Sequence, residues 1–175
     1  MSRRRALRLE DRIREVPDFP KKGILFRDIT PLLMDGEAFG ECVGRMAGLV
    51  RGKVDTVLSI ESRGFIFGSA LANRLGIGFI PIRKQGKLPH KTYRMEYELE
   101  YGTAAVEIHR DALKKGARVV IVDDVLATGG TMKAAVQLAR KCGARVTSIL
   151  FLIELAALGG RRKLRGYPVS TLITY

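Results

Sequence analysis

The chain has 175 residues, of which 46% are hydrophobic, and this length and composition suit one folded domain with a sizeable core. Its net charge is +13, yet no apolar run approaches the ~20 residues that cross a bilayer, and no signal-peptide core follows the basic start. We therefore expect a single cytoplasmic domain over residues 1–175, without a membrane segment.

Positive charge gathers at both ends of the chain. Six arginines fall within the first fourteen residues, and four further cations lie between residues 161 and 165. Such runs either form a solvated surface or bind a polyanion. Because no aromatic residues alternate with these cations, nucleic acid is not the expected partner.

The first half of the chain predicts helices and strands in alternation. Leu9 and Ile13 stand four residues apart, which indicates a short helix that ends before Pro17. Residues 17–31 are then rich in turn formers. The following elements are expected in order: a helix at about 36–51, a strand at 54–60, a turn at 61–64, a helix at 65–75 and a strand at 77–82. This strand–helix–strand unit implies a parallel sheet with a right-handed crossover.

A basic loop and a hairpin follow. Residues 83–92 contain four cations together with Gly86 and Pro89, and they are expected to form an exposed loop, which we call the basic loop. From Tyr93 onward, apolar and charged residues alternate with a period of two. The alternation resumes after Gly102, which is typical of a β-hairpin.

The rest of the chain returns to strands and helices, predicted at 118–123 (strand), 131–142 (helix), 145–153 (strand) and 169–173 (strand). Strands that alternate with helices indicate an α/β domain. In open sheets of this class, ligands bind beyond the carboxyl ends of the strands. Residues 61–64, 83–87 and 123–131 are all expected to meet there.

The stretch Val119–Thr131 is the most informative one. Apolar strand formers lead into Asp123 and Asp124, and a turn rich in Gly and Thr follows before the helix. One acid alone could be only a helix N-cap. Two acids before such a turn can accept hydrogen bonds from sugar hydroxyls or bind a hydrated cation, while the turn offers N–H groups to a phosphate. No Gly-Lys-Ser/Thr follows the glycines, so the turn is not a Walker A loop.

Two other segments carry cations that suit a polyanion. Arg63 follows a predicted strand and is either an ordinary surface arginine or a bidentate clamp on pyrophosphate. The basic loop is either a solvated connection or a lid that orders over its ligand and excludes water. Glu100, in the hairpin, would face solvent if the hairpin were considered alone.

Over nearly all its length the chain resembles the adenine phosphoribosyltransferase family of type I phosphoribosyltransferases. The resemblance is carried by six segments: Pro17–Pro20, Gly23–Ile29, Glu61–Gly68, Arg83–Pro89, Leu99–Gly102 and Val119–Thr131. It implies an α/β, type I phosphoribosyltransferase fold with a mostly parallel central sheet flanked by helices. A small N-terminal hood (about 1–35) and a flexible β-hairpin lid (about 83–109) are also implied.

The resemblance further implies a purine-salvage reaction in which adenine and phosphoribosyl pyrophosphate (PRPP) give AMP and pyrophosphate through an oxocarbenium-like transition state. Mg²⁺ would travel with PRPP, without direct protein ligands, and the enzyme would be a homodimer. Asp123 and Asp124 would meet the ribose hydroxyls. The 5′-phosphate would lie in a loop formed by Ala127, Thr128, Gly129, Gly130 and Thr131, which we call the phosphate loop.

Other roles follow from the same resemblance. Arg63, Lys84 and Lys87 would face pyrophosphate, and the Glu61–Ser62 peptide bond would be cis. Glu100 would act as the general acid/base, and Tyr101 would help to close the lid. The adenine site would be formed by Leu25, Phe26, Arg27, Val125 and Leu155, with backbone groups of Leu25 and Arg27 reading the edge of the base.

Two alternatives remain open on the residues alone. One is a phosphoribosyltransferase for another base. Enzymes for oxo-purines usually place a lysine or another hydrogen-bond donor near the O6 acceptor of the base, whereas this chain offers apolar and backbone groups. The other is a PRPP-sensing regulator that binds nucleic acid, which the +13 charge favours. Only about twenty residues precede the hood segments, too few for a DNA-binding domain.

Overall fold

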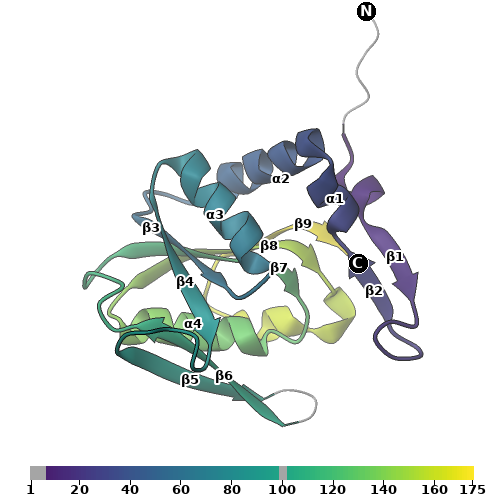
Figure 1. Ribbon diagram of the computed structural model, residues 1–175. Helices are drawn as coiled ribbons and strands as arrows, with labels where there is room; N and C mark the ends of the chain where they lie inside the picture. Colours follow the sequence, from purple (N-terminus) through teal and green to yellow (C-terminus); the bar gives the residue numbers. More distant parts are fainter. Residues whose placement is uncertain (1–6, 99–101) are drawn as a thin grey trace, which may run out of the picture.

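The computed structural model describes residues 7–98 and 102–175. Within these ranges, seven strands form one sheet in the order β5-β6-β4-β3-β7-β8-β9 (Figure 1). The strands are β3 (Thr56–Ile60), β4 (Gly78–Lys84), β5 (Thr92–Glu98), β6 (Thr103–His109), β7 (Arg118–Leu126), β8 (Arg145–Glu154) and β9 (Val169–Thr174). The β3–β4, β3–β7, β7–β8 and β8–β9 pairs are parallel, which confirms the predicted sheet.

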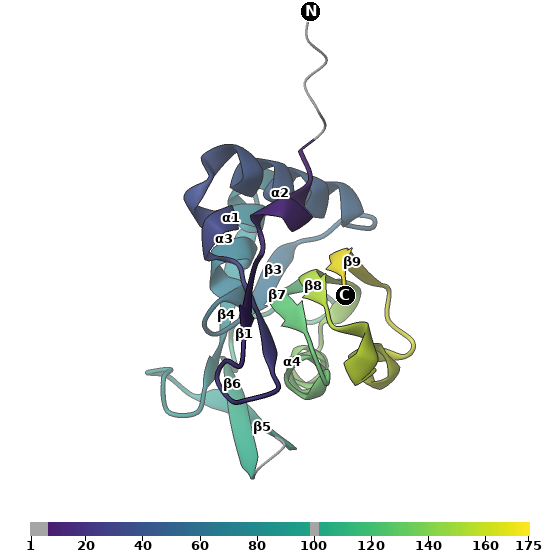
Figure 2. The same cartoon turned by 90° about the vertical axis from the view of Figure 1, so that its right-hand side faces the viewer.

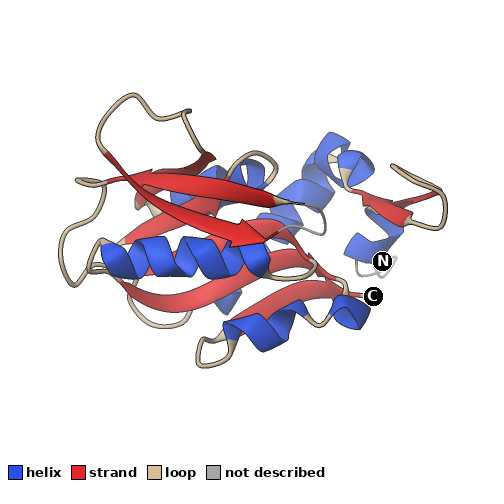
Figure 3. Ribbon diagram, turned by 90° about the horizontal axis from the view of Figure 1, so that it is seen from below, coloured by secondary structure: helices blue, strands red, loops and turns tan. Residues whose placement is uncertain are grey.

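Helices cover both faces of the sheet. The helices α1 (Thr30–Met34), α2 (Gly36–Leu49) and α3 (Gly64–Leu75) lie on one face, and α4 (Gly130–Lys141) lies on the other (Figures 1 and 3). Asp35 caps α2 by accepting hydrogen bonds from the N–H groups of Glu37 and Ala38. None of the described helices is long and apolar enough to cross a bilayer.

The alternation of β7 divides the core between the two faces. Val119 and Ile121 pack in the cluster under α4, whereas Val120 and Val122 pack in the cluster under α2 and α3. All four side chains are fully buried. β7 is therefore covered on both sides, as its continuous apolar run predicts.

β7 is longer than the sequence predicts. The expected strand ends at Asp123, but the observed strand runs on to Leu126, because β8 continues beside it with Val125 opposite Ile153 and Leu126 opposite Glu154. Asp123 and Asp124 therefore lie inside a strand. Strand pairing holds their backbone, so these two residues do not begin a loop.

The N-terminal hood differs more from the prediction. The expected helix is only a 3-10 turn, η1 (Leu9–Arg12), and it is followed by the hairpin of β1 (Arg14–Pro17) and β2 (Leu25–Asp28). Leu9 and Ile13 are both buried, so their spacing predicted burial correctly but did not predict the type of helix. In Figure 2 the hairpin stands on the side of the sheet where β7 and β8 end.

The second hairpin confirms the predicted alternation. β5 and β6 pair in antiparallel fashion, from Thr92 opposite His109 to Glu98 opposite Thr103. Along β5 the side chains of Arg94, Glu96 and Glu98 are exposed, and the residues between them are partly buried. Figure 3 shows this hairpin extending along the sheet on the side of α4.

Candidate active site

A cavity of about 340 Å³ opens where β3 and β7 end, as expected for an open α/β sheet. Four separate parts of the chain meet around it. Its lining consists of Ile60, Glu61, Ser62, Arg63, Lys84, Tyr97, Asp123, Asp124, Val125, Ala127 and Thr131. The structure therefore brings the predicted acids, the predicted Arg63 and the first lysine of the basic loop to one place.

The two acids are crowded together. Asp124 is 5% exposed, and its backbone N–H donates to the Asp123 carboxylate at 2.9 Å. Removal from water and the neighbouring Asp124 charge raise the pKa of Asp123 well above its usual range. A side chain at Gly64 would place its Cβ 2.6 Å from Asp123 Oδ1, so the start of α3 can approach the acids only because residue 64 is glycine.

Arg63 joins two parts of the site. Its Nε lies 2.6 Å from Asp124 Oδ2, which is otherwise buried without a hydrogen-bond partner among the described residues. Its guanidinium carbon lies 5.5 Å from the centre of the Phe26 ring in the hood. The Arg63 side chain remains 45% exposed, so it can still reach a ligand in the cavity.

The phosphate loop lines a second, smaller cavity of about 80 Å³. Gly129 has φ 76°, a left-handed conformation that favours glycine, and α4 begins at the next residue. The first N–H groups of a helix have no partner within the helix, and they stand at the positive end of its dipole, so this loop is suited to bind an anion in the cavity. Ala127 and Thr131 line both cavities, so a ligand in one would adjoin a ligand in the other.

The predicted basic loop begins later than expected, because Arg83 and Lys84 still belong to β4 and pair with β6. Two carboxylates that the sequence analysis did not single out bind the end of β4 and the loop after it. Glu61 accepts hydrogen bonds from Arg83 Nε at 3.2 Å, Arg83 Nη2 at 3.1 Å and the Lys84 N–H at 3.1 Å. The Arg83 guanidinium lowers the pKa of Glu61. Glu107, on β6 and 8% exposed, accepts from the Gly86 N–H at 3.0 Å. An acid amid the apolar residues of β6 was the available signal for Glu107.

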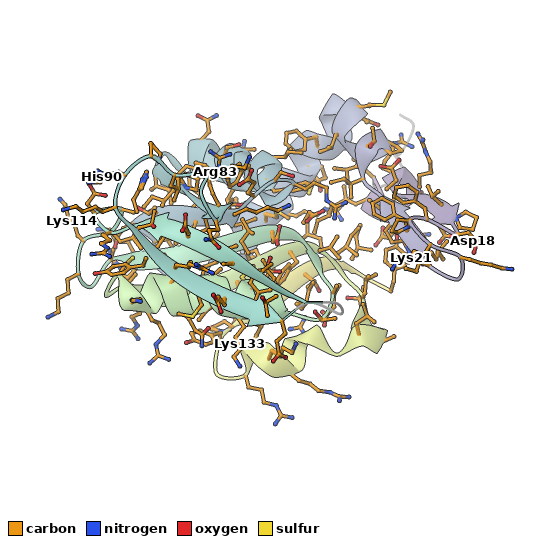
Figure 4. All side chains as sticks on the ribbon, turned by 60° about the horizontal axis from the view of Figure 1, so that its bottom comes forward. Asp18, Lys21, Arg83, His90, Lys114 and Lys133 are labelled. Carbon is orange, nitrogen blue, oxygen red and sulfur yellow. The ribbon has the colours of Figure 1, made fainter. Side chains whose placement is uncertain are left out.

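The two lysines that the resemblance assigns to pyrophosphate are placed differently. Lys84 lines the cavity, whereas Lys87 is absent from its lining and meets Arg83 through its carbonyl oxygen, which accepts from Arg83 Nη1 at 2.9 Å. Figure 4 shows Arg83 and His90 toward opposite ends of this loop, with Asp18 and Lys21 at the hood tip on the other side of the molecule. The Glu61–Ser62 peptide bond is cis, as the resemblance implied.

The candidate base-binding residues are brought together only in part. Val125 lines the cavity, and Leu155 packs in the same apolar cluster as Val125. Leu25, Phe26, Arg27 and Leu155 are absent from the cavity lining, although Phe26 approaches Arg63. Arg27 forms an ion pair with Glu15, and its guanidinium carbon lies 3.8 Å from the centre of the Tyr175 ring. The predicted catalytic Glu100 and the predicted lid residue Tyr101 lie outside the described residues.

Comparison with known proteins agrees with this geometry. The family model for the phosphoribosyl transferase domain matches residues 37–173. The adenine phosphoribosyltransferase of Thermotoga sp. (strain RQ2) is 57% identical over 164 residues, which are 93% of this chain and 96% of that protein.

Solved structures give the same result. The crystal structure of adenine phosphoribosyltransferase from Thermoanaerobacter pseudethanolicus has a TM-score of 0.93 and 54% identity, covering 95% of this chain and 98% of its own. The Saccharomyces cerevisiae enzyme, crystallised with adenine and an imino-altritol bisphosphate, has a TM-score of 0.89 and 40% identity, covering 94% of this chain and 96% of its own. This chain therefore belongs to the adenine phosphoribosyltransferase family and has the type I phosphoribosyltransferase fold.

Proposed function

We propose that the chain transfers the 5-phosphoribosyl group of PRPP to N9 of adenine, giving AMP and pyrophosphate. The observation that carries this proposal is the meeting of the two acids, the phosphate loop, Arg63 and Lys84 around adjoining cavities. A ribose 5-phosphate carrying a pyrophosphate needs all of these groups at once. The names of the similar proteins, and the adenine bound to the yeast enzyme, favour adenine as the acceptor.

The chemistry and position of each group support the following roles toward the sugar-phosphate part of PRPP. Asp123 and Asp124 accept hydrogen bonds from the ribose hydroxyls, and the N–H groups of the phosphate loop bind the 5′-phosphate. Arg63, Lys84 and Lys87 stabilise the departing pyrophosphate. To reach pyrophosphate, Arg63 has to exchange part of its contact with Asp124 for the ligand. The exchange leaves the Asp124 carboxylate free to accept from the sugar.

The bond from C1′ to the pyrophosphate oxygen breaks as the bond from N9 to C1′ forms, and positive charge develops on the ribose in an oxocarbenium-like transition state. Glu100, as the general acid/base, accepts the ring proton that adenine loses when N9 bonds to C1′, and Tyr101 helps to close the lid against water. The adenine ring lies between Leu25 and Phe26 of the hood and Leu155, beside Val125. Backbone groups of Leu25 and Arg27 read its edge.

The donor set fits a Mg²⁺ ion that arrives on the substrate. Among the described residues, no group of three or more His, Cys, Asp or Glu side chains could enclose a metal. Mg²⁺ usually keeps several waters and binds through substrate phosphates together with one or two carboxylates, and Asp123 and Asp124 are available to its water shell. When bound, the ion neutralises pyrophosphate charge.

A pyrophosphate-release assay with PRPP and a panel of bases tests the proposal. We expect release with adenine and Mg²⁺, and loss of release in excess EDTA. Guanine, hypoxanthine, xanthine and the pyrimidines serve as alternative acceptors. Faster release with any of them would overturn the assignment to adenine, and the absence of base-dependent release would favour a regulatory role. Sedimentation of the same sample tests the expected homodimer.

A further inference from the structure

The back of the phosphate loop rests on a segment near the C-terminus. After β8 the chain forms two 3-10 turns, η2 (Ala156–Leu158) and η3 (Gly160–Leu164), seen as the yellow-green helical segment beside α4 in Figure 1. A Cβ built on Gly160 would overlap the Ala127 carbonyl oxygen, and one built on Gly129 would lie 2.6 Å from the Gly160 carbonyl oxygen. The two backbones therefore touch directly, without side chains between them.

One arginine fixes this segment to the sheet. Arg161 Nε donates to Glu154 Oε1 at 3.0 Å, its Nη2 donates to Glu154 Oε2, and its Nη1 donates to the Val169 carbonyl oxygen at 2.8 Å. Glu154 is the last residue of β8 and is 7% exposed, and Val169 is the first residue of β9. A bidentate pair at a mostly buried carboxylate has both the geometry and the limited screening that make an ion pair effective.

Among the described residues, no hydrogen bond or ion pair holds a side chain of the phosphate loop in a comparable way. All five of its residues are Ala, Thr or Gly with little side chain to pack, and Gly129 stands in a left-handed conformation. Outside support therefore decides where its N–H groups point. Gly160, one residue before Arg161, supplies that support from behind.

We propose that Glu154 and Arg161 are a positioning pair for the 5′-phosphate site. The pair keeps Gly160 pressed against Ala127 and Gly129, and so keeps the loop in the shape that binds phosphate. Neither Glu154 nor Arg161 appears in the lining of the two site cavities, so both act through the loop and not on the substrate. This inference rests on the proposed function, because it takes the loop to be the 5′-phosphate site.

The test compares Arg161→Gln with Arg162→Gln. Arg162 lies next to Arg161 in the same turn, is exposed and makes no ion pair among the described residues, so the two variants lose the same charge. Binding of ribose 5-phosphate is measured by calorimetry, and KM for PRPP and for adenine by initial rates, at a temperature where circular dichroism shows both variants folded. Ribose 5-phosphate binding needs no turnover, so it tests the loop even if adenine proves not to be the acceptor.

We expect Arg161→Gln to weaken ribose 5-phosphate binding and to raise KM for PRPP by about 10- to 100-fold, the scale of a displaced binding group. KM for adenine and kcat should change much less, and Arg161→Lys should restore part of the affinity. Arg162→Gln should match the wild type. If Arg161→Gln fails to fold, Arg161→Lys and Glu154→Gln carry the test, with smaller losses in the same direction. Equal ribose 5-phosphate affinity in the 161 and 162 variants, or equal rises in both KM values, would overturn the proposal.

Discussion

At the scale of single residues, the charged carboxylate of Asp123 lowers the stability of the folded protein. Its carboxylate is held beside Asp124 and away from water, and its pKa is raised for that reason. Such a group is accommodated more easily when protonated, so its charged form weakens the folded state. Asparagine keeps an oxygen that can accept from the Asp124 N–H and removes the charge.

Asp123→Asn should therefore raise the melting temperature at pH 8 by a few degrees, because it removes a buried charge that opposes folding. Below pH 3.9, about the pKa of an aspartate in the unfolded chain, the Asp123 carboxyl is protonated in both the folded and the unfolded state, so the substitution brings no gain in stability. The gain grows as the pH rises above this value, and it is complete above the raised pKa of Asp123 in the folded protein. Thermal unfolding between pH 4 and pH 8 checks this. Ribose 5-phosphate binding should weaken in the same variant. A lower melting temperature at pH 8 would show that the charged carboxylate stabilises the fold.

Glu100 gives a second prediction at this scale. If it is the general acid/base, Glu100→Ala should lower kcat ~10²- to 10⁴-fold and leave PRPP binding largely intact. Glu98, exposed at the end of β5, is the matched control, because Glu98→Ala removes a carboxylate from the same hairpin. Rapid-mix and steady-state rates for both variants test whether Glu100 takes part in the chemical step. Near-normal turnover in Glu100→Ala would remove this residue from the mechanism.

Single site residues could be identified from the sequence where they form a motif of neighbouring residues. Asp123, Asp124 and the phosphate loop all lie within one stretch of nine residues, 123–131, so their pattern could be recognised from the sequence before the fold was known. Glu107 and Arg161 could not be recognised from a motif of this kind. Their roles depend on partners 21 and 7 residues away, Gly86 and Glu154, whose approach is decided by strand pairing and turns.

At the scale of elements, the hood shows what apolar periodicity in the sequence cannot predict. Two apolar positions four residues apart cannot distinguish a helix from a 3-10 turn followed by a strand, since both bury Leu9 and Ile13. β2 was hidden because Pro20, Gly23 and Pro31 surround it with turn signals. The long α2, α3 and α4 were predicted well, because each repeats its apolar face over several turns.

The hood is fastened to the sheet by a contact between elements. Arg27 of β2 stacks on the ring of Tyr175, whose N–H donates to the Glu154 carbonyl oxygen and whose carbonyl oxygen accepts from the Ala156 N–H. The Tyr175 backbone is thus held where β8 ends, and its side chain holds β2. Figure 1 shows the C-terminus beside β2.

Tyr175→Leu should therefore loosen the hood and raise KM for adenine by about fivefold, equivalent to ~1 kcal/mol for a partly desolvated cation–π contact. KM for PRPP should hardly change, because its site lies on the other elements. Tyr175→Phe keeps the ring and should behave like the wild type. Initial rates with each substrate varied separately provide the measurement. A loss shared equally by both substrates would mean that Tyr175 supports the domain as a whole.

At the scale of the whole molecule, the sheet explains which residues could be expected to lie together. The residues proposed to bind the sugar-phosphate could be, and those proposed to bind the base could not. Parallel strands bring their carboxyl ends to one edge, so residues 61–64 and 123–131 had to meet once the sheet was recognised. The proposed base site depends on a hood that packs against this edge through Phe26, Arg63 and Tyr175. No periodicity in the sequence fixes that docking, and only the family resemblance indicated it.

The +13 charge acts on the molecule as a whole, and its effect on a highly charged substrate can be measured. PRPP is a polyanion and adenine is neutral, so the field of the protein should favour the approach of PRPP alone. Raising the salt from about 0.02 M to about 0.2 M shortens the screening length from roughly 20 Å to roughly 7 Å. We expect KM for PRPP to rise several-fold over this range while KM for adenine stays within about twofold. Initial rates in potassium chloride, repeated in potassium acetate to separate screening from chloride binding, provide the measurement. If KM for PRPP does not depend on salt, the excess charge does not serve this substrate, and a second anionic partner becomes the better explanation for it.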